Sequence, residues 1–245
     1  MAIRIRKRDR QRRSHRLIKA GDRTMTFVQD SGGPEDGMVV PSLAEIEAAL
    51  AQVPDELSWD WVRSRLVPIF ERGYAEGVPG DPMVNSLTPL GVGIGFGIDL
   101  GPALGRVTSS MARRWEASVE QIERAAFAHL ADLVARIGPG DVQTVVAGGH
   151  FFRAIGEPAG FASSVVLAGE TELMRIFGTR DATLIAPARH SLICFGPAIP
   201  SRVIAEIAVT LEADEPHPLM LDPFLLEDGR LTWDGLADEE PMGPL

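Results

Sequence analysis

The most restrictive feature of the sequence is a run from Leu90 to Gly101 in which glycine alternates with large apolar residues. Successive side chains of a β-strand point to opposite faces of the sheet. One face of this strand therefore carries four large apolar side chains, Val92, Ile94, Phe96 and Ile98. The other face carries almost none, which predicts close approach of a helix, another backbone or a ligand. We expect the apolar stripe of a helix at 119–137 to cover it.

Signals for hairpins and helices alternate along the rest of the chain and predict an α+β fold, in which antiparallel hairpins alternate with helices. Capping residues followed by apolar residues at helical spacing predict helices after Ser42, Thr108, Ser118, Ser163 or Ser164, and Ser201. Strands are expected at 65–70 and 104–107. Three hairpins are expected around turns at 148–149, 187–190 and 228–229.

Glycine and proline at 138–140 predict a boundary between two subdomains that share a core. The expected division is a disordered basic arm and linker at 1–33, a subdomain with the glycine strand at 34–137, a hairpin–helix subdomain at 141–235 and an acidic tail at 236–245.

Charge is unevenly distributed, since residues 1–23 hold ten Lys and Arg against two Asp, a net charge of +8. The whole chain carries −10, so the remainder carries −18. The candidate contacts for nucleic-acid phosphates are Arg4, Arg6, Lys7, Arg8, Arg12 and Arg13. We expect no nucleic-acid partner, because the arm lacks aromatic residues for base stacking and the acidic remainder repels a polyanion. The arm could instead fold onto the acidic body, or be translated leader upstream of a start at Met25.

The single cysteine, Cys194, excludes an intramolecular disulfide and suits a reducing compartment. Its apolar neighbours predict a buried, inert thiol. The longest apolar run is shorter than the ~20 residues of a membrane-spanning helix, and no apolar segment follows the charged N-terminus as in a secretory signal. We therefore expect a cytoplasmic protein with no membrane partner.

The motifs of several enzyme classes are absent from the sequence. The glycine run contains no G-x-G-x-x-G register, and the chain has neither a G-K-[ST] loop nor a G-x-S-x-G elbow. The five histidines and one cysteine show no metal-ligand spacing. We expect no metal and no cofactor, and His129 is expected to be a packed or half-exposed surface residue.

Four residues are candidates for ligand binding. Asp99 and Gly101 end the glycine strand, where the carboxylate could contact a ligand or, as we favour, accept from nearby backbone amides. Arg189 and His190 occupy a predicted hairpin tip, where charged side chains are usually solvated. His150 and Arg153 lie three apart in one strand and hence on opposite faces, so they are not expected to serve one site.

Several segments resemble the YtpQ-like family of bacterial proteins. They are Asp99-Leu100-Gly101, Arg106-Val107-Thr108, Met111, Trp115, Ser118 to Ile122 and Ala125 to Leu130, followed more weakly by Gly160 to Ser164 and Thr183 to Ile193. The resemblance covers roughly residues 60–235 and implies a bacterial cytosolic α+β protein without assigning a reaction. The chain departs from the family pattern at Ala162 and Ser191, where the family tends to have Asp, and at His129, where it has Asn.

Two functions follow as hypotheses. The first is a non-enzymatic binding or accessory module with a protein or small-molecule partner, favoured because no set of catalytic residues converges in the sequence. The alternative is an enzyme of unrecognised class with a site beside the glycine strand, using Asp99 with Arg189 or His190. A closed pocket with convergent polar groups over the bare glycine face would favour the enzyme.

Overall fold

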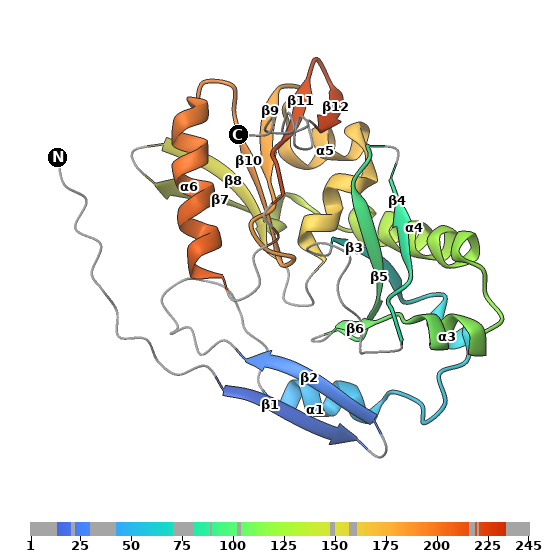
Figure 1. The fold of residues 1–245 in the computed structure, drawn as a ribbon. Coiled ribbons are helices and arrows are strands. Elements are labelled where there is room, and N and C mark those ends of the chain that lie inside the picture. Colours follow the sequence, from blue (N-terminus) through green and yellow to red (C-terminus); the bar gives the residue numbers. More distant parts are fainter. Residues whose placement is uncertain are drawn as a thin grey trace, which may run out of the picture.

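The computed structural model describes residues 14–20, 23–29, 43–70, 81–88, 90–101, 104–147, 150–156, 161–215, 219 and 221–233. Helices and antiparallel sheets make up this part of the chain, which confirms the predicted α+β fold (Figure 1).

The larger sheet has six strands in the order β12-β11-β9-β10-β8-β7, and all neighbours are antiparallel. Its strands are β7 (Val142–Ala147), β8 (His150–Gly156), β9 (Ala182–Ile185), β10 (Ser191–Phe195), β11 (Phe224–Glu227) and β12 (Arg230–Trp233). The three predicted hairpins are therefore present. Asp228 and Gly229, which connect β11 to β12, both have positive φ angles of 50° and 75°, as a tight two-residue hairpin turn requires.

The smaller sheet is built around the glycine strand, β5 (Gly93–Asp99). On one side β5 pairs with β3 (Leu66–Phe70), and on the other with β4 (Asn85–Leu87) and β6 (Leu104–Arg106). The strands predicted at 65–70 and 104–107 are confirmed, and Pro68 lies in an edge strand, where a missing amide is tolerated. The short strand β4 was not predicted.

Capping explains where two of the helices begin. Ser118 and Gln121 form a reciprocal capping box at the start of α4 (Val119–Ala135). The short helix α3 (Ser109–Arg114) begins after Thr108 as predicted, but Thr108 makes no side-chain cap. Instead, Asp81 accepts from the Ser110 amide at 2.7 Å and from the Ser110 hydroxyl at 2.6 Å. Both bonds lower the pKa of Asp81, and the bond from the Ser110 hydroxyl has the larger effect.

The remaining helices are α1 (Leu43–Ala51), α2 (Trp59–Val62), α5 (Glu170–Phe177), α6 (Ser201–Asp214) and the 3-10 segments η1 (Pro139–Asp141) and η2 (Ala162–Ala168). The single helix predicted from Ser163 or Ser164 to Phe177 is wrong. Gly169, with φ +90°, separates η2 from α5, because this backbone conformation cannot continue a helix. Pro200, and not Ser201, is the N-cap of α6.

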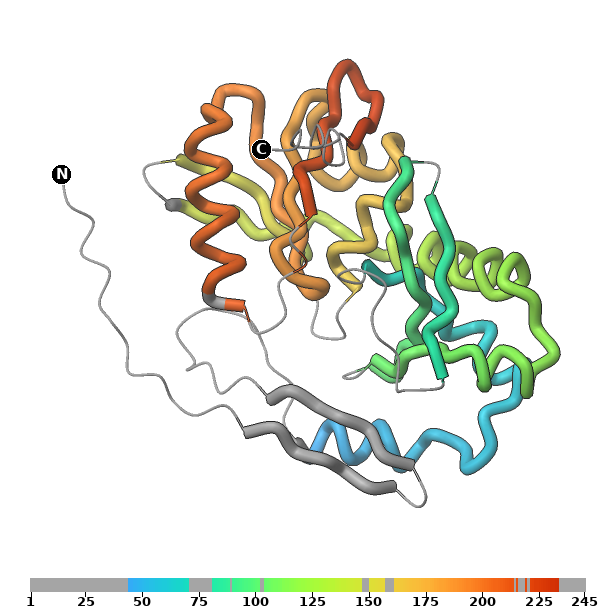
Figure 2. Tube along the Cα trace, viewed as in Figure 1, coloured from blue at the N-terminus to red at the C-terminus, as the bar shows by residue number. Residues whose placement is uncertain are grey.

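Helices cover both faces of the six-stranded sheet (Figure 2). One face packs Phe152, Ile193 and Phe195 against Ile204 of α6. The other face shares the largest buried cluster with η2, α5, α4 and the side-chain-bearing face of β5. Phe70 of β3 contacts Phe224 of β11, with ring centroids 5.9 Å apart. The apolar core thus includes residues from both sides of 138–140, while the division into four segments stays a prediction.

The glycine-bearing face of β5 is not covered at Gly97 by the helix that we expected. A Cβ atom placed on Gly97 would lie 2.8 Å from Cδ1 of Leu104, in the neighbouring strand β6. The closest cover at this position is thus a strand side chain, not the stripe of α4. That stripe is also shifted, since Val134 is buried and Val119 is 39% exposed.

Part of the segment predicted to be a disordered arm forms a two-stranded antiparallel sheet, β1 (Ser14–Ala20) and β2 (Arg23–Gln29). Gly21-Asp22 separates two segments of strand-forming residues, and such a glycine-containing dipeptide favours a tight hairpin turn. The predicted nucleic-acid contacts at Arg4, Arg6, Lys7, Arg8, Arg12 and Arg13, and the predicted tail at 236–245, lie outside the described residues.

Candidate binding pocket

Asp99 and Gly101 form a local turn at the end of β5. Oδ1 of Asp99 accepts a hydrogen bond from the Gly101 amide at 2.8 Å, which is the capping role we favoured over ligand contact. Gly101 has φ +81°, a conformation that favours glycine. The backbone amide of Asp99 also donates to the carbonyl of Arg65 at 2.7 Å.

The other carboxylate oxygen of Asp99 faces His129, which belongs to α4. Oδ2 and His129 Nε2 are 3.6 Å apart, and the side chains are only 17% and 16% exposed. This distance is longer than a hydrogen bond, and His129 Nε2 has no hydrogen-bond partner among the described residues. Sequence reasoning missed this pair because the two residues lie on different elements and share no local spacing.

Arg189 and His190 do not sit on a solvated hairpin tip, so that expectation is wrong. Nε of Arg189 donates to the Phe70 carbonyl at 3.3 Å, and His190 Nε2 lies 3.3 Å from Glu215 Oε1. The neighbouring turn residues Pro187 and Ala188 are buried. Backbone bonds from Ser163 to the Arg189 carbonyl and from Leu219 to the Pro187 carbonyl explain the burial, because both segments fold over the turn.

The predicted site residues form two separate pairs. Asp99 contacts the backbone at Arg65, and Arg189 contacts the backbone at Phe70. Five residues of extended chain span roughly 16 Å, so the pairs lie at opposite ends of β3. The structure does not bring Asp99 together with Arg189 or His190.

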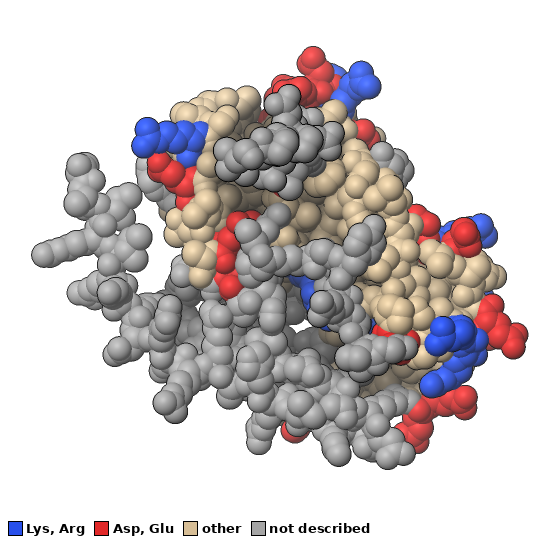
Figure 3. All heavy atoms as spheres, in the orientation of Figure 1, with Lys and Arg blue, Asp and Glu red and all other residues tan. Residues whose placement is uncertain are grey.

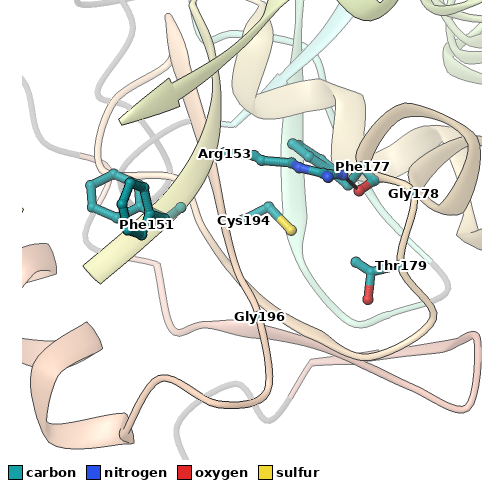
Figure 4. Close-up of a pocket in the computed structure, with 8 residues that line it drawn as sticks. Phe151, Arg153, Phe177, Gly178, Thr179, Cys194 and Gly196 are labelled. Carbon is teal, nitrogen blue, oxygen red and sulfur yellow. Dashed lines mark hydrogen bonds between the residues drawn. The ribbon is translucent and has the colours of Figure 1, made fainter. Parts of the chain in front are cut away.

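A pocket of about 230 Å³ lies elsewhere, between the six-stranded sheet and the end of α5 (Figure 4). It is lined by strands β8 and β10, the loop after α5 and the residue after β10. The lining residues are Phe151, Phe152, Arg153, Phe177, Gly178, Thr179, Cys194 and Gly196. Arg153 and Cys194 face each other across β8 and β10 in the antiparallel register, so their side chains lie on the same sheet face.

The Arg153 side chain crosses the pocket from β8 to the last turn of α5 (Figure 4). Its Nη1 donates to the Phe177 carbonyl, which satisfies one of the carbonyls that a helix C-terminus leaves unpaired. A Cβ atom on Gly178 would lie 3.2 Å from this nitrogen, and Gly178 has φ +62°. Glycine at this position therefore both ends α5 and leaves room for the guanidinium.

Arg153 has no carboxylate partner within 4.0 Å in the part of the chain that the structure describes. A guanidinium carries five N–H donors, and the single hydrogen bond to Phe177 leaves four of them for other acceptors. The pocket therefore presents a positive charge, on a solvent-exposed residue, with spare hydrogen-bonding capacity.

Cys194 contributes a neutral thiol to the pocket. The residue is 4% exposed, and burial raises the pKa of Cys194 to about 12, although the nearby positive charge of Arg153 acts in the opposite direction. Only the thiolate is an effective nucleophile. The structure thus confirms the prediction that the cysteine is buried.

An exposed apolar pair borders the pocket on β7 and β8. Val146 and Phe151 are direct neighbours across the two strands and are 59% and 69% exposed. Phe151 precedes Arg153 by two residues, so both side chains point to one face of the sheet. An apolar rim beside a single cation is suited to a ligand with an apolar and a charged part.

Within the described ranges, no group of three or more His, Cys, Asp or Glu side chains could hold a metal ion. No helix among them is long and apolar enough to cross a membrane. On the face shown in Figure 3, acidic and basic side chains of the described residues are intermixed and form no extended basic patch.

Comparison of the chain with protein-family models, with curated proteins and with solved structures found no match. The resemblance to the YtpQ-like family therefore stays a prediction.

Proposed function

We propose that this protein is a non-enzymatic binding module and that its ligand occupies the pocket crossed by Arg153. The observation that carries the proposal is the guanidinium of Arg153, which has no carboxylate partner among the described residues and lies beside apolar side chains in a pocket that is open to solvent. Of the lining residues, only Arg153 and Cys194 have ionisable side chains. A guanidinium that stays protonated and a thiol that stays neutral at physiological pH are poor general bases and poor nucleophiles.

The size of the pocket favours a small ligand. Its volume of about 230 Å³ is below the ≈ 300–1,000 Å³ that is usual for sites that hold drug-sized molecules. We place the protein in the bacterial cytoplasm, as the YtpQ-like resemblance and the single cysteine suggest.

A substitution that fills the pocket tests this proposal. A Cβ atom on Gly196 meets no atom within 4 Å, so Gly196→Leu can occupy the cavity without an immediate clash. Gly93→Leu is a matched control, because Gly93 is equally open and lies in the other sheet. Calorimetric titration with phenylacetate and its neutral isostere phenylacetamide should detect binding to the unsubstituted protein and to Gly93→Leu, but not to Gly196→Leu. Equal binding by both variants, or no binding of either probe to the unsubstituted protein, contradicts the proposal.

The Asp99–His129 pair supports an enzyme as the second candidate function. A carboxylate that faces an imidazole is a common arrangement for orienting a general base, and this pair lies at the end of the glycine strand, near the predicted enzyme site. If the pair is catalytic, a substrate must contact His129, and His129→Gln must remove the activity while the fold is retained. Our first proposal instead predicts that His129→Gln binds both probes as tightly as the unsubstituted protein.

A further inference from the structure

We propose that the pocket selects small organic monoanions in which a carboxylate is joined to a flat apolar group. This inference rests on the proposed binding function and specifies its ligand class. The argument concerns the charge, the hydrogen-bond donors and the walls of the pocket.

The charge of the pocket favours a ligand with one negative charge. Arg153 is the only cationic side chain among the lining residues. The C-terminal end of α5 also faces the pocket, because Arg153 binds the carbonyl of its last residue, Phe177. A helix C-terminus carries a partial negative charge. This dipole opposes every anion, so the guanidinium is the one group that compensates ligand charge. A single guanidinium neutralises a carboxylate but leaves a dianion such as a phosphate monoester with one uncompensated negative charge.

The donors of Arg153 also suit a carboxylate. A planar guanidinium presents paired N–H groups that match the two oxygens of a carboxylate. Only Nη1 is engaged by Phe177, so a second pair of donors remains for a ligand. The bond to Phe177 limits the motion of the side chain, and such preorganisation lowers the ordering cost of binding.

The apolar part of the ligand would contact the aromatic walls. Phe151 and Phe177 both line the pocket, and Phe151 is 69% exposed whereas Phe177 is buried. A water molecule occupies ≈ 30 Å³ in the liquid, so the pocket of about 230 Å³ corresponds to about eight water molecules. A single aromatic ring with a short acidic side chain is therefore the appropriate size of probe.

Calorimetric titration with three probes that share one ring tests the charge selectivity. We expect phenylacetate to bind at least about tenfold more tightly than phenylacetamide and than phenyl phosphate, because a hydrogen bond to a charged group contributes ≈ 1.5–3 kcal/mol. Arg153→Gln should bind phenylacetate and phenylacetamide equally. Arg63→Gln is the control, since Arg63 is a cation just after α2 with a side chain 58% exposed, and it should keep the full preference for phenylacetate.

The outcomes separate this inference from the proposed function. Equal affinity of the unsubstituted protein for phenylacetate and phenylacetamide, with both lost in Gly196→Leu, overturns the charge selectivity but retains a binding pocket. Tighter binding of phenyl phosphate than of phenylacetate also overturns the inference. Absence of binding by all three probes overturns both proposals. Because the comparison among probes uses the unsubstituted protein, it decides the question even if Arg153→Gln fails to fold.

Discussion

Gly97 provides the sharpest test of how the glycine strand is packed. A Cβ atom at this position would lie 2.8 Å from Cδ1, 2.9 Å from Cγ and 3.0 Å from Cδ2 of Leu104. Carbon atoms in favourable contact are ≈ 3.5–4.0 Å apart. Rotation of the Leu104 methyl groups cannot relieve the clash, because Cγ itself is too close. Gly97→Ala therefore forces Leu104 to a different χ1 angle or moves strand β6.

We expect this rearrangement to cost about 1–3 kcal/mol, as for overpacking in other cores. Replacing glycine by alanine in a strand gains about 0.5–1 kcal/mol when the conformation is compatible, and Gly97 does not have a positive φ angle. The net loss in the free energy of unfolding should thus be about 0–2.5 kcal/mol, and small if the partly buried Leu104 side chain shifts easily. Gly93→Ala is the control, because a Cβ atom there meets nothing within 4 Å, and it should be neutral or slightly stabilising.

A double-mutant cycle with Leu104→Ala isolates the contact. Once the Leu104 side chain is shortened, Gly97→Ala should no longer destabilise the protein, so the coupling energy should be about 2 kcal/mol. Urea unfolding of the two single variants and the double variant measures this coupling. If Gly97→Ala changes the free energy of unfolding by the same amount with and without the Leu104 side chain, the packing argument is wrong.

Three further perturbations have defined outcomes. Because burial raises the pKa of Cys194 to about 12, above the ≈ 8.5 of an unfolded thiol, the unfolded state loses its proton first as the pH rises. This group should therefore lower the free energy of unfolding by about 1.4 kcal/mol per pH unit above about pH 8.5. In urea unfolding at pH 8, 9 and 10, the free energy of unfolding of Cys194→Ala should fall less steeply with pH than that of the unsubstituted protein. Equal dependence on pH in the two proteins contradicts the raised pKa of Cys194. The hydroxyl of Ser164 is fully buried without a hydrogen-bond partner among the described residues, so Ser164→Ala should be neutral or stabilise the protein by up to about 1 kcal/mol. By contrast, Ser118→Ala removes the cap of α4 and should cost about 1 kcal/mol. A loss of stability in Ser164→Ala, measured by urea unfolding, refutes the first expectation. Fluorescence anisotropy should show no binding of duplex DNA at about 0.15 M salt, and a micromolar dissociation constant that is lost when residues 1–13 are removed would establish the basic arm as a nucleic-acid contact.

Local signals predicted most of the fold because the features concerned are determined within a few residues. The capping box of Ser118 and Gln121 places the start of α4, and Asp228-Gly229 supplies the two positive φ angles of the last hairpin. Strand β4 was missed because three residues are too few to show alternation. The hairpin of β1 and β2 was missed because the high density of arginines suggested disorder, although Gly21-Asp22 between strand-forming segments was a usable turn signal.

The candidate sites depend on contacts between distant segments, which local patterns do not determine. Arg153 reaches the carbonyl of Phe177, 24 residues away, and no spacing rule connects a strand residue to the end of a later helix. The Asp99–His129 pair likewise joins a strand to a helix. Turn 187–190 was expected to be solvated from its composition, but Ser163 and Leu219 fold over it. In each case the residue was singled out in the sequence, but its surroundings depend on tertiary packing.

The location of a bound ligand is the most direct test of the proposed binding module. Amide chemical shifts of the full chain, recorded during titration with phenylacetate, identify the residues that a ligand contacts. We predict saturable changes with one dissociation constant at Phe151, Arg153, Gly178, Thr179 and Gly196, and none of comparable size at Gly101 or His129. Changes centred on His129 and Gly101 with the Arg153 pocket unaffected, or no saturable change at all, would contradict the account.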